Sequence, residues 1–293
     1  MKELFKKVGK PLAGLLLLCG ILYQLDLPRL LEISRGIDYS WVGLGFICLV
    51  LSNFFSALRW RKISEILGVN ISTSLAVVTY AQGITANTVL PGGILGGDLW
   101  RTLALVSAGA TKSTALMTVI LDRLSGVWML SILSFAAILL QIYLKALPAD
   151  ISVSWVVLYS LFALLLVFTP YFCLLFKSKA PTIFFKTAIL STLVQCFALI
   201  AFAFCLYAIT PNFSSTGLIA VCMGIFIVGA LPLAIGGFGA REFGAVMFLT
   251  LLGLSSEEGF LASALFGLLG TIQGLLSTYF WLNRRQFVAE FRP

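Results

Sequence analysis

Residues 90–101 of this sequence read LPGGILGGDLWR, and residues 231–241 read LPLAIGGFGAR. With one residue gapped, the two stretches share Leu-Pro, an Ile three residues after the Pro, Gly-Gly, and an Arg four residues after the second Gly. Each interrupts a long apolar run, because proline removes a backbone donor and glycine permits irregular dihedral angles. The sequence therefore predicts two helical hairpins, with halves at 71–90 and 94–110 and at 217–231 and 238–254.

The whole chain has the composition of a membrane protein. Of its 293 residues, 60% are hydrophobic and only 11% are charged, whereas soluble domains carry about 25% charged residues. Mean hydropathy is +1.03. The expected fold is an all-α, polytopic integral membrane helical bundle with two re-entrant hairpins. About six segments are expected to form full spans, at 11–25, 39–58, 114–143, 151–176, 183–208 and 259–282.

Basic residues set the expected orientation of these spans. The basic residues behind the net charge of +8 lie mostly at span edges. We therefore attribute this charge to the orientation of the spans in the membrane and expect no nucleic-acid partner. By the positive-inside rule, both termini lie on the cytoplasmic side of the cell membrane, and residues 1–27 form an uncleaved first span. The cluster at 59–62 (Arg-Trp-Arg-Lys) is expected to be an interfacial anchor. Residues 28–38 are expected to lie on the outer surface as an amphipathic segment.

This orientation makes the two halves of the chain an inverted repeat. The stretch 63–112 must begin and end in the cytoplasm, and 211–258 must begin and end outside, so the two hairpins enter the membrane from opposite faces. We expect residues 1–293 to form a single transmembrane domain, in which 39–143 and 183–283 are the two repeat units. Irregular backbone at membrane depth is tolerated only inside protein or against a watery cavity, so the hairpin turns should line one.

Charged residues at the hairpins are candidates for function, since intramembrane charges are functional by default. The hairpin arginines, Arg101 and Arg241, follow helix starts whose free amides and dipole suit a phosphate group. The hairpin carboxylates, Asp98 and Glu242, have two readings of equal weight. They neutralise the arginines or cap the helices, or they couple transport to protons or cations.

Asp122 and Arg123 lie inside the expected span at 114–143. Adjacent residues on a helix do not face each other, so each needs a partner elsewhere. We expect Arg123 to pair with a hairpin carboxylate and Asp122 with a hairpin arginine. A purely structural ion pair that holds a hairpin to the bundle is the alternative.

In their order and spacing, these motifs resemble the flippase-like transmembrane family of lysylphosphatidylglycerol synthases. The matching residues are Asn87, Leu90-Pro91-Gly92, Gly96-Gly97-Asp98, Arg101, Asp122-Arg123, Pro232, Gly236-Gly237-Phe238-Gly239 and Glu242. The resemblance covers most of the chain and implies translocation or binding of a lipid with a charged head group. We expect this protein to lack the synthase domain of the bifunctional members, and we therefore expect no enzyme activity. With no histidine and no cysteine cluster, we also expect no cofactor and no metal.

The function predicted is that of a lipid flippase-like protein, which binds an anionic or phosphate head group and moves the lipid between leaflets. A secondary transporter of a small organic anion and a non-transporting scaffold for a lipid-modifying enzyme remain alternatives. Membrane lipids are the expected partners, and a homo-oligomer or a partner enzyme stays open. Candidate head-group and translocation residues are Asn87, Asp98, Arg101, Asp122, Arg123, Arg241 and Glu242. Candidate hairpin-turn residues are Pro91, Gly92, Gly93, Gly96, Gly97, Pro232, Gly236, Gly237 and Gly239.

Overall fold

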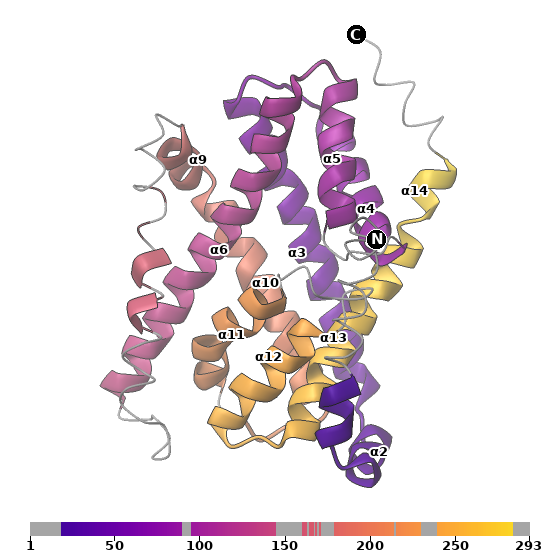
Figure 1. Cartoon of the computed structure of the whole chain (residues 1–293), viewed down its shortest axis with the longest axis vertical. Coiled ribbons are helices and arrows are strands. Elements are labelled where there is room, and N and C mark those ends of the chain that lie inside the picture. The colour runs from indigo at the N-terminus through magenta and orange to yellow at the C-terminus, as the bar shows by residue number, and fades with distance from the viewer. Residues whose placement is uncertain are drawn as a thin grey trace, which may run out of the picture.

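The protein is described from a computed structural model, in which all regular elements of the described residues are helices, as expected (Figure 1). The described residues are 19–89, 95–144, 160–162, 164–166, 168, 170, 179–213, 215–229 and 239–283. Two of the expected spans, 11–25 and 151–176, lie largely outside them. Six expected turn residues also lie outside them, namely Pro91, Gly92, Gly93, Pro232, Gly236 and Gly237.

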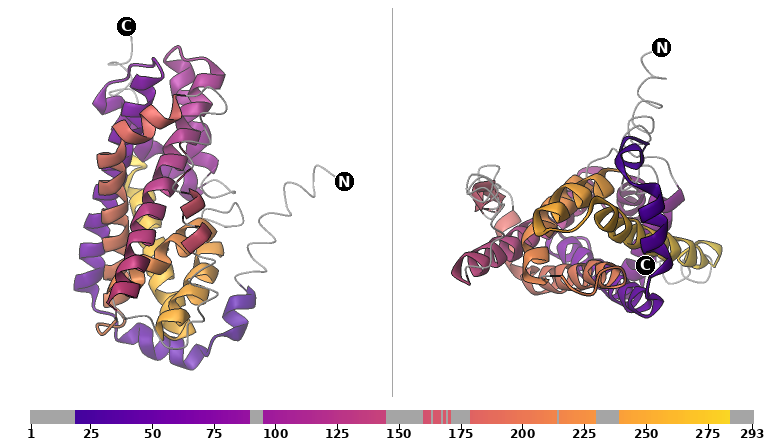
Figure 2. Two further views of the ribbon diagram at one scale, coloured as in Figure 1. Left: turned by 90° about the vertical axis from the view of Figure 1, so that its left-hand side faces the viewer. Right: turned by 90° about the horizontal axis from the view of Figure 1, so that it is seen from below.

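Four helices in this part of the chain are long and apolar enough to cross a membrane, which confirms the other four predicted spans. They are α3 (Tyr39–Ile66), α6 (Lys112–Tyr143), α10 (Ala188–Tyr207) and α13 (Ser256–Leu276) with its short extension α14 (Tyr279–Leu282). They run along the long axis of an elongated bundle (Figure 2). The protein is therefore a helical membrane protein.

Polar side chains mark the starts of the long helices. The Asp38 carboxylate accepts a hydrogen bond from the backbone near the start of α3, and the Thr111 hydroxyl does the same for α6. At α13, Ser255 and Glu258 form a reciprocal capping box. These caps satisfy amides that have no partner within their own helix.

Two pairs of short helices lie where the sequence predicts hairpins. The first pair is α4 (Thr73–Val89) and α5 (Leu95–Ser107), which pack against each other. The second pair is α11 (Ser215–Gly229) and α12 (Ala240–Leu249), the latter continued by the 3-10 turn η2 (Thr250–Leu252). The predicted halves agree with these bounds to within a few residues.

Glycines let the helices of each pair approach closely. A Cβ atom at Gly97 of α5 would lie 2.5 Å from the carbonyl oxygen of Gly83 in α4. One at Gly229 of α11 would lie 2.8 Å from the Cβ of Arg241 in α12. Gly239, just before α12, has a φ of 117°, which L side chains rarely adopt. Gly96 lies beside Gly97 in the first turn of α5.

The helices pack in a regular pattern around the centre of the bundle. The first long helices of the two halves, α3 and α10, pack side by side, while α6 packs against α11 and α13 packs against α4. The largest apolar core lies where α10, α11 and α12 meet, and it is centred on Phe202, Met223 and Leu249.

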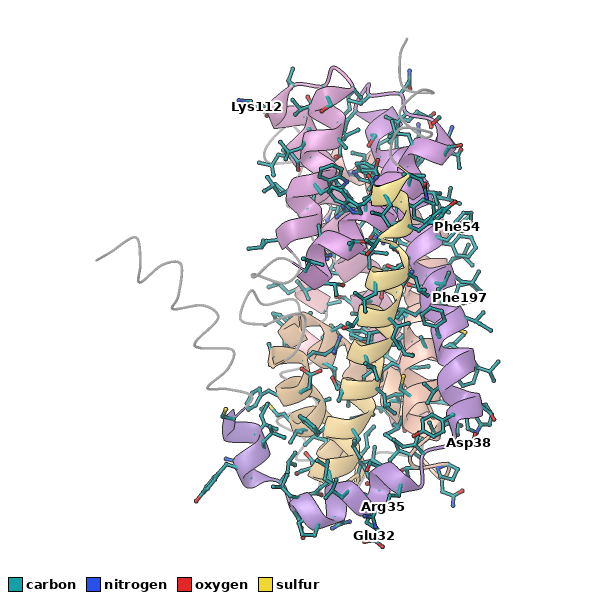
Figure 3. All side chains as sticks on the ribbon, turned by 90° about the vertical axis from the view of Figure 1, so that its right-hand side faces the viewer. Glu32, Arg35, Asp38, Phe54, Lys112 and Phe197 are labelled. Carbon is teal, nitrogen blue, oxygen red and sulfur yellow. The ribbon has the colours of Figure 1, made fainter. Side chains whose placement is uncertain are left out.

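Charged side chains lie at the two ends of the bundle, and apolar side chains lie on its flank. Figure 3 shows Glu32, Arg35 and Asp38 at one end and Lys112 at the other, with Phe54 and Phe197 on the flank between them. The helix α2 (Leu27–Arg35) overlaps the amphipathic segment expected at 28–38; it has no buried residue and packs against α13.

The interfacial anchor predicted at residues 59–62 is wrong for its first two residues. Arg59 is only 4% exposed and Trp60 is fully buried, because α3 continues past them and turns this face toward α6. The Trp60 indole donates to the Thr118 hydroxyl, and Arg59 forms an ion pair with Asp122. The other two residues of the cluster are partly exposed.

Candidate functional site

Five charged side chains from α3, α5 and α6 form one chain of ion pairs, which we call the charge ladder. Arg123 holds Asp98 through two hydrogen bonds, from Nη2 to Oδ1 (2.8 Å) and from Nε to Oδ2 (3.1 Å). Arg101 donates from Nη2 to the same Asp98 Oδ1 (2.7 Å) and from Nη1 to Asp122 Oδ2 (2.7 Å). Arg59 Nε donates to the other oxygen of Asp122 (2.8 Å). Positive and negative groups therefore alternate from Arg123 to Arg59.

The ladder runs from the surface into the interior. The side chain of Arg123 is 43% exposed, that of Asp98 is 21% exposed, and those beyond them are almost fully buried. Asp122 and Arg123 point apart although they are neighbours in α6, which confirms that each needs a partner elsewhere. Both partners come from the alternatives named from the sequence, a hairpin carboxylate for Arg123 and a hairpin arginine for Asp122.

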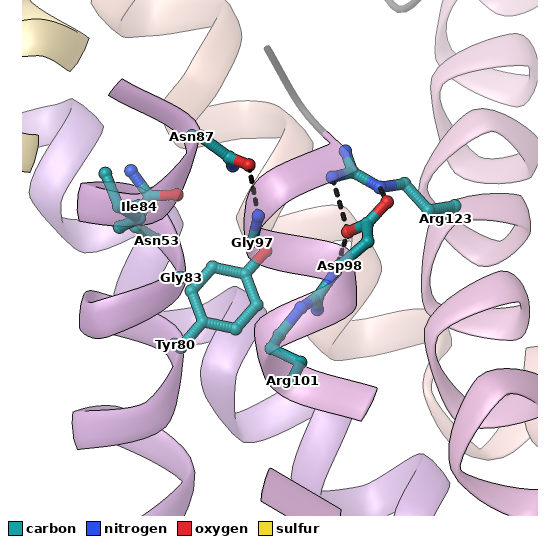
Figure 4. A pocket seen from close by; sticks show the side chains of 9 residues that line it. All are labelled: Asn53, Tyr80, Gly83, Ile84, Asn87, Gly97, Asp98, Arg101 and Arg123. Carbon is teal, nitrogen blue, oxygen red and sulfur yellow. Dashed lines mark hydrogen bonds and ion pairs between the residues drawn. The ribbon is translucent and has the colours of Figure 1, made fainter. Parts of the chain in front are cut away.

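A polar cavity of about 120 Å³ opens beside the outer end of the ladder (Figure 4). Its volume is enough for several water molecules. Asn87 of α4 accepts a hydrogen bond from the Gly97 amide (2.6 Å) and so holds the first turn of α5 against α4. Arg101 lies over the Tyr80 ring, 4.7 Å from its centroid. The lining residues are Asn53, Tyr80, Gly83, Ile84, Asn87, Gly97, Asp98, Arg101 and Arg123.

The second hairpin carries a separate, self-contained group. Arg241 Nη2 donates to Glu242 Oε1 (2.8 Å), and Arg241 Nε donates to the Ser263 hydroxyl of α13 (3.0 Å). That hydroxyl donates to Glu242 Oε1 (3.0 Å). The other oxygen of Glu242 accepts from the Gly239 amide at the start of α12 (2.5 Å). Glu242 thus neutralises its neighbouring arginine and caps its own helix.

The structure brings the candidate residues together in two groups rather than one. Asn87, Asp98, Arg101, Asp122 and Arg123 lie around the pair α4 and α5, whereas Arg241 and Glu242 lie at the pair α11 and α12. Within the part of the chain that the structure describes, no ion pair joins the two groups. The same residues contain no cluster of carboxylate, cysteine and histidine side chains that could hold a metal ion.

Sequence reasoning missed several residues of the site. Arg59 was assigned to the interface, and Asn53 and Tyr80 were not singled out. Asn53 Nδ2 donates to Gln273 Oε1 of α13 (2.7 Å) beside the cavity. A signal existed for Asn53 and Gln273, because an amide side chain inside an apolar span needs a hydrogen-bond partner.

Comparison with protein families agrees with the resemblance noted in the motifs. The model of the lysylphosphatidylglycerol synthase TM region matches residues 8–277, which is nearly the whole chain. No curated protein matches the sequence. The described residues also contain four helices that are long and apolar enough to cross a membrane. The chain therefore belongs to the family of the lysylphosphatidylglycerol synthase transmembrane region, a family of membrane-embedded proteins related to lipid handling.

Proposed function

We propose that this protein moves a lipid with an anionic, phosphate-bearing head group between membrane leaflets, as a transporter rather than an enzyme. The observation that carries the proposal is the position of Arg123. It is half-exposed and shares one face of α6 with Leu116 and Ile120, which are 52% and 41% exposed. Its guanidinium nevertheless belongs to the buried ladder through Asp98.

The neighbouring helix α5 presents a matching apolar stripe. Leu95, Leu99 and Leu103 are 51%, 59% and 49% exposed, and their spacing of four residues places them on one face. Exposed apolar side chains of a membrane helix face acyl chains, whereas charges there are costly and functional. The outer end of the ladder therefore adjoins a lipid-facing surface, and an amphiphile can place its head on Arg123 and its chains on the leucines.

This arrangement favours a lipid over a small organic anion. A transporter of small anions requires an enclosed site, because an opening toward the acyl chains offers a water-soluble anion no path. A scaffold without transport activity requires no exposed charge beside an apolar stripe. In the proposal, a phosphate oxygen takes the place of Asp98 on Arg123 and Arg101, with bidentate contacts to the guanidinium groups. Asp122 continues to hold Arg101 from behind.

Helix lengths support the proposal that both short pairs are re-entrant hairpins. At about 1.5 Å per residue, α5 is about 20 Å long and α12 about 15 Å, from their 13 and 10 residues. Both are shorter than the ~30 Å hydrocarbon core of a bilayer. Neither helix can cross on its own, which fits hairpins that enter and return.

The packing supports the inverted repeat, with units 39–143 and 183–283. Exchanging α3 with α10, α4–α5 with α11–α12, and α6 with α13 leaves the main contacts unchanged, since α4 packs on α13 as α11 packs on α6. In each unit, the hairpin arginine bonds to the closing long helix, Arg101 to Asp122 and Arg241 to Ser263. We propose that the two units form one transmembrane domain of the cytoplasmic membrane, with both termini in the cytoplasm.

The proposal is tested in vesicles that contain the purified full chain and a fluorescent phosphatidylglycerol analogue in both leaflets. A membrane-impermeant quencher reports how fast analogue from the inner leaflet becomes accessible. We expect wild type to accelerate this exchange over protein-free vesicles. Arg123→Gln should slow it at least about tenfold, because a charge-assisted hydrogen bond contributes about 1.5–3 kcal/mol.

The matched control is Arg61→Gln, which removes the same charge outside the ladder and should leave the rate unchanged. Arg101→Glu should abolish exchange while the protein still inserts. Wild-type rates in both ladder variants would contradict the proposal. A scaffold would instead give wild-type vesicles no faster than protein-free ones.

A further inference from the structure

Arg59 occupies the buried end of the ladder, opposite the cavity. Its Nε atom is bonded to Asp122, but its Nη1 atom is buried and has no hydrogen-bond partner among the described residues. The space for this guanidinium depends on Gly126 of α6, where a Cβ atom would lie 3.3 Å from Arg59 Nη1. The bundle thus accommodates a third arginine without fully satisfying it.

The ladder carries one excess positive charge. Arg59, Arg101 and Arg123 contribute three charges, and Asp98 and Asp122 offset two. Arginine stays protonated in proteins, and each carboxylate here forms ion pairs with two arginines. No further carboxylate among the described residues pairs with these arginines.

The corresponding group in the second unit shows no such excess. There Arg241 is offset by Glu242, and a neutral hydroxyl, that of Ser263, stands where the first unit has Asp122. Without Arg59, the first unit would be neutral in the same way. Arg59 therefore supplies the charge by which the net charge of the first unit exceeds that of the second.

We propose that Arg59 is a specificity-determining residue that sets the ladder to accept a head group with one net negative charge. The inference rests on the proposed function, since it assumes that the head group binds at the outer end of the ladder. An uncompensated charge in an apolar interior costs several kcal/mol, so a single anion at Arg123 restores neutrality. A phosphodiester head group with no other charge meets this requirement, whereas a zwitterionic head group does not.

The proposal predicts that lipid preference follows the net charge of the ladder. Wild type carries +1, Arg59→Gln carries zero, Asp122→Asn carries +2, and the double variant returns to +1. Each full-length protein is given equal amounts of phosphatidylglycerol and phosphatidylcholine with identical acyl chains, and native mass spectrometry measures the ratio retained. Arg61→Gln is the matched control and should keep the wild-type ratio.

We expect wild type to retain more phosphatidylglycerol and Arg59→Gln to lower the ratio about tenfold, which corresponds to about 1.4 kcal/mol. Arg59→Lys and the double variant should restore the ratio, and Asp122→Asn should raise it. If the double variant stays as low as Arg59→Gln, Arg59 acts through packing and the proposal is overturned. If Arg59→Gln does not fold, an unchanged ratio in Asp122→Asn overturns it equally.

If wild type translocates lipid in the vesicle assay but the ratio does not depend on the charge of the ladder, only the role of Arg59 is wrong. If wild type neither translocates nor retains either lipid, the proposed function itself is wrong.

Discussion

Substituting Gly97 by alanine tests whether the close contact between α4 and α5 builds the candidate site. The added Cβ would lie 2.5 Å from the Gly83 carbonyl oxygen and 2.8 Å from Asn87 Oδ1. The first neighbour is backbone, so it cannot rotate away. The two helices must separate, which also stretches the hydrogen bond from the Gly97 amide to Asn87.

The magnitude follows from three contributions. Overpacking a tight contact costs about 1–3 kcal/mol, and the lost hydrogen bond costs about 1 kcal/mol. Replacing a helical glycine by alanine gains about 1 kcal/mol. The net destabilisation expected for Gly97→Ala is therefore about 1–3 kcal/mol.

The matched control is Gly270→Ala in α13, where a Cβ atom would meet nothing within 4 Å. It should show only the gain in helix propensity, so the two variants should differ by about 2–4 kcal/mol. Equilibrium unfolding in mixed micelles, followed by tryptophan fluorescence, measures both. Equal stability of the two variants would refute the packing argument. Wild-type lipid exchange in a Gly97→Ala protein whose stability has fallen would show that the close contact does not build the candidate site.

Two further substitutions probe the contacts that hold the hairpins to the bundle. Arg241→Gln should destabilise the protein by about 3–5 kcal/mol, since it leaves the fully buried carboxylate of Glu242 without its ion-pair partner. Glu242→Gln should cost less, because the side chain of Arg241 is 14% exposed; the double variant should cost less than the sum of the two, and additive effects in the unfolding assay would show that the pair is not coupled. Trp281→Ala removes an indole hydrogen bond to the Gln82 carbonyl (3.2 Å) and a ring contact with Trp100, in which the two ring centroids lie 4.1 Å apart. Hydrogen exchange of the α4 amides should then accelerate about tenfold, and unchanged protection would show that α14 does not hold the first hairpin.

Helix positions followed closely from the sequence because their causes are local. The apolar runs at 39–58 and 114–143 each became one long helix, since length and hydropathy suffice to define a span. The predicted half at 94–110 became α5 (Leu95–Ser107), which differs mainly at its end.

The ion pairs could be predicted from the sequence only in part. The rule that adjacent helical residues point apart correctly gave Asp122 and Arg123 separate partners and named the correct classes. It left two candidate partners each for Asp122 and Arg123, because distance along the chain does not measure distance in space. In the structure Arg123 pairs with Asp98 and Asp122 pairs with Arg101, both from the helix pair nearer in sequence. Arg241 pairs with Glu242 instead.

Composition, hydropathy and motif order are enough to identify a helical membrane protein of the lysylphosphatidylglycerol synthase transmembrane family, with two short helix pairs between long spans. The burial of Arg59 and its pairing with Asp122 could be seen only once the helices were placed in space. A basic residue near the end of a span satisfies the positive-inside rule whether it faces water or a partner. What distinguishes the two is a carboxylate 63 residues away on α6, and contacts of that range arise only when the helices pack.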